Sequence, residues 1–388
     1  MPVTITIPGV QYSGIWTMQQ VNAAIAAGTW PTAPGPALFS WGRNTSGRLG
    51  LGNTTDYSSP KQIGALIKWA NAASGQQQGF AIKTDGTLWS WGRNVYGELG
   101  LGNTTYYSSP KQVGSLTSWL RIAGGNYYAL AVKTDGTLWS WGRNQYGQLG
   151  LNNTTYYSSP KQVGALTSWL YVGATTLASI AIKTDGTLWT WGANFQGTLG
   201  LGNTTNYSSP KQVGALTTWA KFSPSSQTYR CFTVIKTDGT LWTWGYGVLG
   251  QLGLGGTTDY SSPKQVGALT TWYYAFGGQF ASFATKTDGT LWAWGYNSVG
   301  QLGLGDTTQR NSPVQVGSLT NWLQGTAGQY FALATKTDGT LWSWGKNNFG
   351  QLGLGNTTYY SSPKQVGSLN TWLQVAAGYS SAITIKNT

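Results

Sequence analysis

Acidic residues recur in one short motif, and they are the first candidates for chemistry in this sequence. The motif Lys-Thr-Asp-Gly contains Asp85, Asp135, Asp185, Asp238, Asp288 and Asp338. General acid–base catalysis would need two such carboxylates to converge with separated pKa values. Each Asp is followed by Gly, however, and Asp-Gly is typical of tight turns. We therefore expect these carboxylates to shape turns and to lie far from one another.

The other chemical signals are weaker. The sequence contains no His, which excludes His-dependent acid–base catalysis and His metal ligands. Its single Cys, Cys231, excludes a disulfide framework. The Leu-Gly-Leu-Gly string at residues 99–102 is similar to a phosphate-binding loop, but no helix signal follows it and the string recurs along the chain. We predict a protein that is not an enzyme and that uses no cofactor or metal.

The recurrence of these strings indicates an internal repeat. The pair Trp-Gly begins at Trp41, Trp91, Trp141, Trp191, Trp244, Trp294 and Trp344. The steps are 50 residues, except for one step of 53 residues after Trp191. A fixed period of this size is typical of solenoids, propellers and arrays. Because the units carry strand signals and no helix signal, we predict a propeller.

One unit, residues 119–164, contains four strand signals. Trp119 opens the first strand, residues 128–133 form the second, and residues 138–142 form the third. The Asp-Gly between the second and third strands is a strong hairpin signal. A long loop rich in Gly, Asn and Thr follows, and the fourth strand is predicted over residues 160–164 with Pro160 at its start. Four strands per unit match one propeller blade.

The two ends of the repeat region are predicted to share a blade. Residues 37–42 and 60–64 supply a third and a fourth strand, whereas residues 372–386 supply a first and a second. We therefore predict an all-β fold over residues 37–388, a seven-bladed β-propeller closed by pairing residues 379–386 with residues 37–42. Such closure removes exposed strand edges.

The repeat strings also resemble a known family. The patterns W-G-x-N-x-x-G-Q-L-G-L-G, S-P-x-x-V and K-T-D-G-T-L-W-S-W-G look like the regulator-of-chromosome-condensation repeat over roughly residues 37–388. The resemblance implies a seven-bladed propeller. That family includes exchange factors for a small GTPase, ubiquitin-ligase modules and secreted β-lactamase inhibitors, so it does not fix a function. Where the family usually has a His after the first strand, this chain has Gln78, Tyr128, Ala281, Phe331 and Ser381, which counts against exchange activity.

Residues 1–36 are predicted to be a separate N-terminal extension that anchors the propeller. A short helix is expected from Ser13 to Gly28, followed by a Pro-rich linker. The predicted anchoring residues are Ile15, Trp16, Met18, Val21, Ile25 and Trp30. The string at residues 13–31 is similar to segments of structural proteins of tailed phages. The alternative is that the helix folds back onto the propeller.

Variation between the repeats predicts where a partner binds. The loops that follow the first and third strands share one face and differ between units, whereas the opposite face repeats Thr-Asp-Gly-Thr. Variation over a fixed scaffold is typical of recognition surfaces. The predicted binding face comprises Tyr96, Tyr106, Tyr127, Tyr128, Tyr146, Tyr156, Phe195, Tyr229, Phe280, Arg310, Tyr330, Phe331, Phe349, Tyr359 and Tyr379. For Tyr128 and Phe331, the alternative is packing at the mouth of the channel.

Charge and hydropathy narrow the classes of partner. The formal net charge is +13, but most Lys residues recur once per repeat, so we expect charge spread around the ring and no nucleic-acid partner. No apolar run approaches the length needed to span a bilayer, so we expect no membrane insertion.

These observations lead to two functional hypotheses. The first is a non-catalytic structural or adhesive protein of a phage particle, attached to the capsid or tail. In the virion it would bind other virion proteins, a host surface protein or a glycan. The alternative is a regulatory protein-interaction propeller in the cytoplasm, such as a small-GTPase exchange factor or a protein inhibitor.

Overall fold

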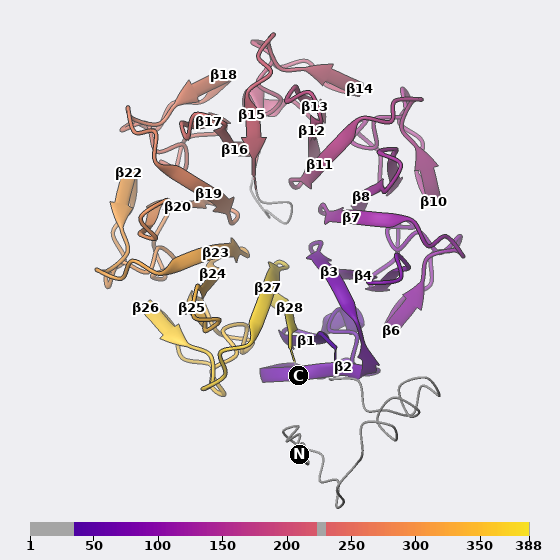
Figure 1. Ribbon diagram of the computed structural model, residues 1–388, viewed down its shortest axis with the longest axis horizontal. Coiled ribbons are helices and arrows are strands. Elements are labelled where there is room, and N and C mark those ends of the chain that lie inside the picture. Colours follow the sequence, from indigo (N-terminus) through magenta and orange to yellow (C-terminus); the bar gives the residue numbers. More distant parts are fainter. Residues whose placement is uncertain (1–34, 223–229, 388) are drawn as a thin grey trace, which may run out of the picture.

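The chain forms a closed ring of seven sheets around a central axis (Figure 1). A computed structural model describes residues 35–222 and 230–387. Each of the seven sheets has four strands, and neighbouring strands within a sheet are antiparallel. We call the strands of a blade A, B, C and D from the centre of the ring to its rim. The predicted fold class, an all-β seven-bladed propeller, is confirmed.

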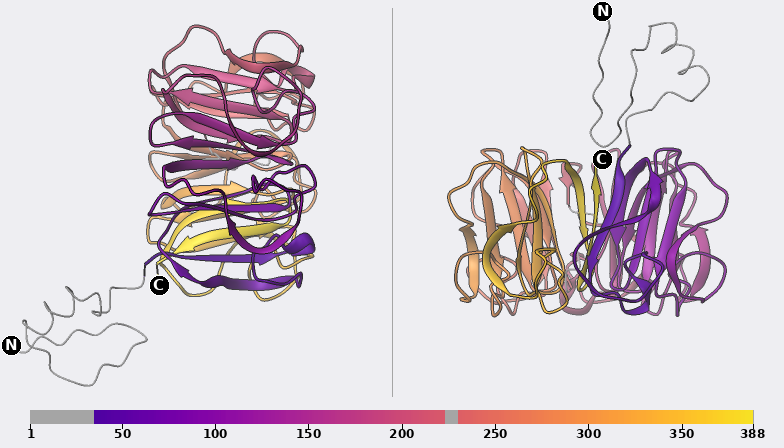
Figure 2. Two further views of the ribbon diagram at one scale, coloured as in Figure 1. Left: turned by 90° about the vertical axis from the view of Figure 1, so that its right-hand side faces the viewer. Right: turned by 90° about the horizontal axis from the view of Figure 1, so that it is seen from below.

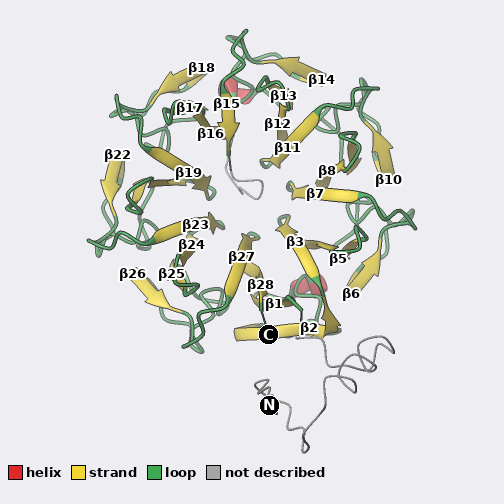
Figure 3. Ribbon diagram, viewed as in Figure 1, coloured by secondary structure: helices red, strands yellow, loops and turns green. Residues whose placement is uncertain are grey.

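The strands have the following bounds. The A strands are β3 (Trp69–Ser74), β7 (Trp119–Gly124), β11 (Trp169–Ala174), β15 (Trp219–Lys221), β19 (Trp272–Gly277), β23 (Trp322–Ala327) and β27 (Trp372–Ala377). The B strands are β4 (Gln78–Lys83), β8 (Tyr128–Lys133), β12 (Ala178–Lys183), β16 (Cys231–Lys236), β20 (Ala281–Lys286), β24 (Phe331–Lys336) and β28 (Ser381–Lys386). The C strands are β1 (Ala37–Gly42), β5 (Leu88–Gly92), β9 (Leu138–Gly142), β13 (Leu188–Gly192), β17 (Leu241–Gly245), β21 (Leu291–Gly295) and β25 (Leu341–Gly345). The D strands are β2 (Tyr57–Ile67), β6 (Tyr107–Gln112), β10 (Tyr157–Gln162), β14 (Tyr207–Gln212), β18 (Tyr260–Gln265), β22 (Arg310–Gln315) and β26 (Tyr360–Gln365). Two short 3₁₀ turns, η1 (Thr45–Gly47) and η2 (Phe195–Gly197), lie between C and D strands (Figure 3).

The ring is closed by strands from both ends of the repeat region. One sheet has the order β2-β1-β28-β27, so its A and B strands follow the other six blades in sequence and its C and D strands precede them. Strand β28 pairs with β1 without interruption, from Ala37 opposite Lys386 to Gly42 opposite Ser381. The predicted closure is therefore confirmed.

The D strands begin earlier than the sequence predicts. Strand β10 starts at Tyr157, opposite Gly142, and ends at Gln162, whereas we predicted residues 160–164. The register shifts between Tyr157 and Lys161, which places Pro160 within an irregular stretch of an outer-edge strand. A Pro at such a position removes no ladder hydrogen bond that the sheet needs.

Buried Trp residues join each blade to the one before it. The Trp of every Trp-Gly pair is fully buried, and its indole N–H donates to a backbone carbonyl in the preceding C–D loop. Trp141, for example, donates to the Glu98 carbonyl at 3.0 Å. At the closure, Trp41 donates to the Gln351 carbonyl at 2.9 Å, across almost the whole length of the chain. One repeated contact thus links the seven blades.

The Asp-Gly turns are built from local hydrogen bonds. Asp135 Oδ1 accepts from the Thr137 backbone N–H at 2.9 Å and from the Thr137 hydroxyl at 2.7 Å. Trp139 Nε1 donates to the same hydroxyl at 2.9 Å. Lys133 Nζ lies 3.8 Å from the Trp139 ring centroid, a cation–π contact that leaves this lysine 7% exposed. The repeated carboxylates therefore shape turns, as the sequence predicts.

These turns should make the fold sensitive to acid. Hydrogen bonds from the following Thr, first from its hydroxyl and then from its backbone, lower the pKa of Asp85, Asp135, Asp185, Asp238, Asp288 and Asp338. A carboxylate with a lowered folded-state pKa stabilises the fold above its unfolded pKa, and this contribution disappears as the pH falls through the folded pKa. We expect the melting temperature to fall as the pH drops below about 4, the ordinary pKa of an Asp carboxyl. Asp→Asn replacement at all six positions should flatten this part of the profile. An unchanged pH profile in the replaced chain would contradict the assignment.

The ring has two faces that differ in composition. The A–B and C–D loops form one, the loop face; the Asp-Gly turns and the D–A connections form the other, the turn face. The described chain enters and leaves at the turn face: Trp69 N–H donates to the Pro36 carbonyl, and Asn387 N–H donates to the Thr371 carbonyl (Figure 2). Among the described residues, no helix has the length and apolar character that crossing a membrane would require.

Candidate interaction surface

Most of the predicted binding residues lie on the loop face in partly exposed positions. Tyr106, Tyr156 and Tyr359 are the most open, with 41–45% of their surface exposed. Partly buried side chains are found at Tyr96, Tyr127, Tyr146, Phe195, Phe280, Arg310, Tyr330, Phe349 and Tyr379. Tyr229 and the predicted anchoring residues Ile15, Trp16, Met18, Val21, Ile25 and Trp30 lie outside the described residues.

Tyr128 and Phe331 do not belong to this surface, which corrects the sequence prediction. They are 0% and 2% exposed. Each is the first residue of a B strand, and its ring lies over an A–B loop glycine, Gly125 or Gly328, where a Cβ would come within 2.0 Å of the ring. The Tyr128 hydroxyl donates to the Ala178 carbonyl of the next blade at 2.7 Å. The two rings pack between blades because their glycine neighbours leave room for them.

The partly exposed aromatic residues form clusters that cross blade boundaries. The Tyr96 ring centroid lies 5.4 Å from that of Tyr127 and 5.6 Å from that of Tyr156. A second cluster contains Phe280, Tyr296 and Tyr330, with centroid separations of 6.0–6.3 Å. Rings that contact one another in this way are already ordered, so a partner would bury them at a low entropic cost.

Basic residues on the loop face are the functional candidates that our sequence analysis missed. The position after the Trp-Gly pair holds Arg43, Arg93, Arg143, Ala193, Tyr246, Tyr296 and Lys346. Because the ring is closed, its four basic members lie on four consecutive blades. Arg48, in the C–D loop of the closing blade, is only 3% exposed, so it adds positive charge to this region but no accessible donor. We call Arg43, Arg93, Arg143 and Lys346 the cationic arc.

Burial and neighbouring groups shift the pKa of two arginines of this region in opposite directions. Burial first, and then the neighbouring charge of Arg43, lowers the pKa of Arg48 to about 10, and Arg93 adds to this effect. Burial alone would lower the pKa of Arg93, but the nearby hydroxyls of Tyr127 and Tyr106 outweigh it and raise the pKa. Both arginines stay positively charged at neutral pH, so this part of the loop face carries concentrated positive charge.

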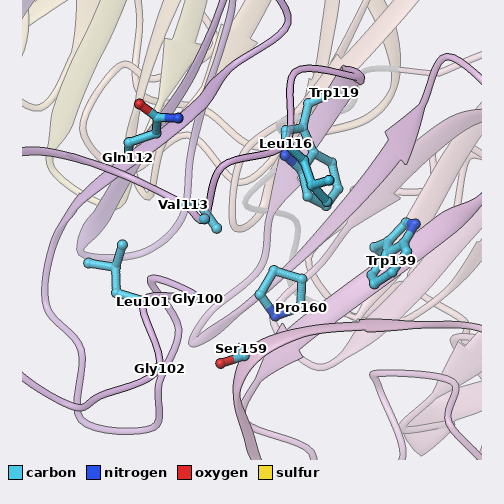
Figure 4. A pocket seen from close by; sticks show the side chains of 11 residues that line it. Gly100, Leu101, Gly102, Gln112, Val113, Leu116, Trp119, Trp139, Ser159 and Pro160 are labelled. Atoms are coloured by element: carbon cyan, nitrogen blue, oxygen red, sulfur yellow. The ribbon is translucent and has the colours of Figure 1, made fainter.

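The turn face offers a different, apolar surface. Six leucines of the D–A connections, which we call the leucine ring, are 45–50% exposed: Leu116, Leu166, Leu216, Leu269, Leu319 and Leu369. Leu116, Trp119, Trp139 and Pro160 are among the residues that line a groove of about 300 Å³ between two blades (Figure 4). An equivalent groove of about 390 Å³ includes Leu269 and Trp272. The leucine ring repeats with little change, so it lacks the variation of the loop face.

The described residues do not bring together a recognisable set of catalytic or metal-binding groups. Burial raises the pKa of the Cys231 thiol to about 12, which keeps it protonated and unreactive. The turn aspartates are separated by whole blades and bonded within their own turns. In residues 35–222 and 230–387, no three His, Cys, Asp or Glu side chains are grouped as a metal site would require.

Comparison with known families gives a match over most of the chain. The profile of the regulator of chromosome condensation (RCC1) repeat matches residues 37–82, 85–132, 135–176, 185–225, 238–285, 288–335 and 338–385. A second profile of the same repeat matches residues 120–148 and 324–351. A search of curated protein sequences returned no match.

Solved structures agree on the fold. The chain is similar to human WBSCR16, with a TM-score of 0.80 and 22% identity over 91% of this chain and 99% of that one. It is also similar to Prp20p from Saccharomyces cerevisiae, with a TM-score of 0.79 and 18% identity over 92% of each chain. The yeast protein bound to Kap60 gives a TM-score of 0.80 and 18% identity over 100% of this chain and 97% of that one. None of these is a phage protein, so the resemblance of residues 13–31 gains no support.

Proposed function

Because the chain belongs to the RCC1 repeat family, we propose that it is a non-catalytic, regulatory interaction module that binds a protein partner through its loop face. The observation that carries this proposal is the pattern of variation. Seven nearly identical blades hold loops whose aromatic and basic side chains differ from blade to blade. A rigid scaffold that presents variable loops is the usual arrangement of a recognition surface.

The composition of the loop face suits a protein partner. Tyr and Arg are enriched at protein interfaces, where the rings supply contact area and the guanidinium groups supply directed hydrogen bonds. One structural relative also binds proteins: Prp20p was studied for its binding to Gsp1p and histones, and its complex with Kap60 has been solved. This relative shares only the fold at 18% identity, so it supports the class of partner and not its identity.

The non-catalytic part of the proposal has its own support. Candidate general acids and bases lie in turns on separate blades, and their carboxylates accept hydrogen bonds from their own turn residues. Catalysis would need such groups to converge on one substrate atom. Partner binding needs only the continuous surface that the loops provide.

The virion hypothesis is more specific and has less support. It depends on the sequence of residues 13–31, which lie outside the described residues. The family match and the solved relatives favour the alternative of a regulatory propeller over a virion component. We therefore propose the regulatory propeller, with the cytoplasm as its expected location in place of the virion.

Partner capture with two matched variants tests the proposal. Tyr106→Ser with Tyr156→Ser removes exposed rings from the loop face, whereas Leu166→Ser with Leu216→Ser removes comparable apolar area from the turn face. All four side chains are 41–50% exposed, so neither variant should disturb the core. We expect proteins captured from an extract of the native source to be depleted at least about tenfold by the tyrosine variant alone.

The opposite result would place the interface elsewhere. Loss of the captured proteins with the leucine variant, and retention with the tyrosine variant, would assign binding to the leucine ring. Equal capture by both variants and the wild type would remove the support for any specific face. Each captured protein should be confirmed by titration with the purified propeller.

A further inference from the structure

The loop face is electrically uneven around the ring. The cationic arc occupies four consecutive blades, and the corresponding positions on the other three blades are Ala193, Tyr246 and Tyr296. On that other side, Arg310 is neutralised by Asp306 in an ion pair of 2.6 Å, the only ion pair among the described residues. Arg230, in an A–B loop on that side, donates to Gln196 Oε1 at 3.1 Å and lies 4.9 Å from the Phe195 ring centroid. The basic side chains of this face are therefore more numerous on the side of the arc, although they are not confined to it.

Two carboxylates near the arc, Asp56 and Glu98, interact electrostatically with arginines of this region but form no ion pair with them. Asp56 Oδ1 accepts a hydrogen bond from the Asn44 backbone N–H at 2.6 Å. Glu98 is 0% exposed, and its Oε2 accepts from the Tyr96 backbone N–H at 2.6 Å. Neither lies within 4 Å of an arc side-chain nitrogen in the described structure. The arc thus presents positive charge that an incoming group could pair with.

The side chains of the arc are held in place by aromatic rings. The guanidinium carbon lies 4.6 Å from the Phe349 centroid for Arg43 and 4.4 Å from the Tyr127 centroid for Arg93. Arg143 lies 5.5 Å from the Tyr96 centroid. At the far end of the arc, Lys346 Nζ lies 5.3 Å from the Tyr330 centroid. Cation–π stacking orders these groups before a partner arrives.

Stacking also determines which part of each arginine can bind. A guanidinium group that stacks on a ring uses its flat face, and its N–H donors lie in the plane of the group. The Nε of Arg43 donates to Thr45 Oγ1 at 2.8 Å, which orients the group and leaves its terminal nitrogens for a carboxylate in a bidentate arrangement. Nη2 of Arg143 donates to Gln145 Oε1, and Arg93 is hydrogen-bonded to the side chains of Tyr106 and Tyr127. A carboxylate would share or replace these neutral partners.

We infer that the cationic arc binds an acidic segment of the protein partner, whose Asp or Glu carboxylates pair with Arg43, Arg93, Arg143 and Lys346 along consecutive blades. This inference rests on the proposed function and specifies the chemistry of the partner. Single-stranded nucleic acid fits the arc less well, because bases need free aromatic faces and the rings of the arc are already stacked by its cations.

The test uses a defined probe, a fluorescent peptide of ten glutamates, with the full chain. We expect saturable binding at low salt that weakens as the salt concentration rises. Arg93→Gln with Arg143→Gln should weaken it by about tenfold. Arg43→Gln with Lys346→Gln, at the other end of the arc, provides an independent second variant. Lys161→Gln with Lys211→Gln is the matched control, because it removes two exposed charges from the outer strands β10 and β14, outside the loop face, and it should bind like the wild type.

Four results would overturn the inference. The first is a lack of saturable binding of the glutamate peptide at low salt, and the second is equal binding of a ten-glutamine peptide. The third is equal binding of the glutamate peptide by the wild type and both arc variants. The fourth is tighter, arc-dependent binding of a ten-nucleotide oligothymidine, which would indicate a nucleic-acid site. The capture experiment tests the loop face with variants that change no charge, and the peptide titration tests the arc. If the tyrosine variant lost capture and the peptide failed to bind, the proposed function would stand and only the acidic partner would be rejected.

Discussion

A chain that ends at Ser380, and therefore lacks β28, is expected to lose the closed ring and to aggregate. Strand β28 lies between β27 and β1 and pairs with both, so its removal leaves two sheet edges unpaired within one blade. It also removes Ala382, Ile383 and Ile385, which are 0–2% exposed. Burial of each isoleucine side chain stabilises the fold by about 1.5–3 kcal/mol. The unpaired strand edges would in addition promote association between chains.

The control is a chain that lacks only Asn387 and Thr388. This shorter deletion keeps all six residues of β28 and removes the hydrogen bond from Asn387 N–H to the Thr371 carbonyl. Size-exclusion chromatography and thermal melting should show a folded protein for the control and aggregates or a broad, early transition for the chain that ends at Ser380. If the longer deletion remained a monomer with the melting temperature of the wild type, β28 would not be needed for closure.

Closure could be predicted from the sequence because strand signals are local and the repeat is regular. Each Trp-Gly pair and each Asp-Gly turn marks a fixed place in its blade, so the missing strands at one end match the extra strands at the other. The start of the D strands was less predictable. Pro160 suggested a strand boundary, yet the edge position of β10 lets the strand pass through it.

The candidate surface was only partly predictable, because a sequence shows which residue types recur but not which way they point. Tyr128 and Tyr127 are adjacent and chemically identical, yet Tyr128 begins the fully buried strand β8 and Tyr127 lies in the A–B loop before it, where it is partly exposed. The cationic arc could be identified only from the closed ring. In sequence, Lys346 is about 300 residues from Arg43, and only closure makes their blades neighbours.

Loss of a single Trp between blades is expected to have the second-largest effect on stability. Trp191 is 0% exposed, and its Nε1 donates to the Gln148 carbonyl at 2.9 Å. Trp191→Ala should lower the free energy of unfolding by about 3–5 kcal/mol, because it leaves a cavity at a blade interface and removes that hydrogen bond. Chemical denaturation of the wild type and the variant measures the difference, and a cost below about 1 kcal/mol would contradict the packing argument.

The matching Trp→Phe changes separate the hydrogen bond from the packing. The Gln148 carbonyl also accepts from the Ser179 hydroxyl at 2.8 Å, so it keeps a donor in Trp191→Phe. At the closure, Ala382 stands where Ser179 stands in its blade and has no hydroxyl to donate to the Gln351 carbonyl. Trp41→Phe should therefore lower the free energy of unfolding by about 1–3 kcal/mol more than Trp191→Phe does, since it leaves the buried Gln351 carbonyl without a hydroxyl donor. Equal costs for the two variants would show that packing, and not the hydrogen bond, accounts for the contribution of these residues to ring closure.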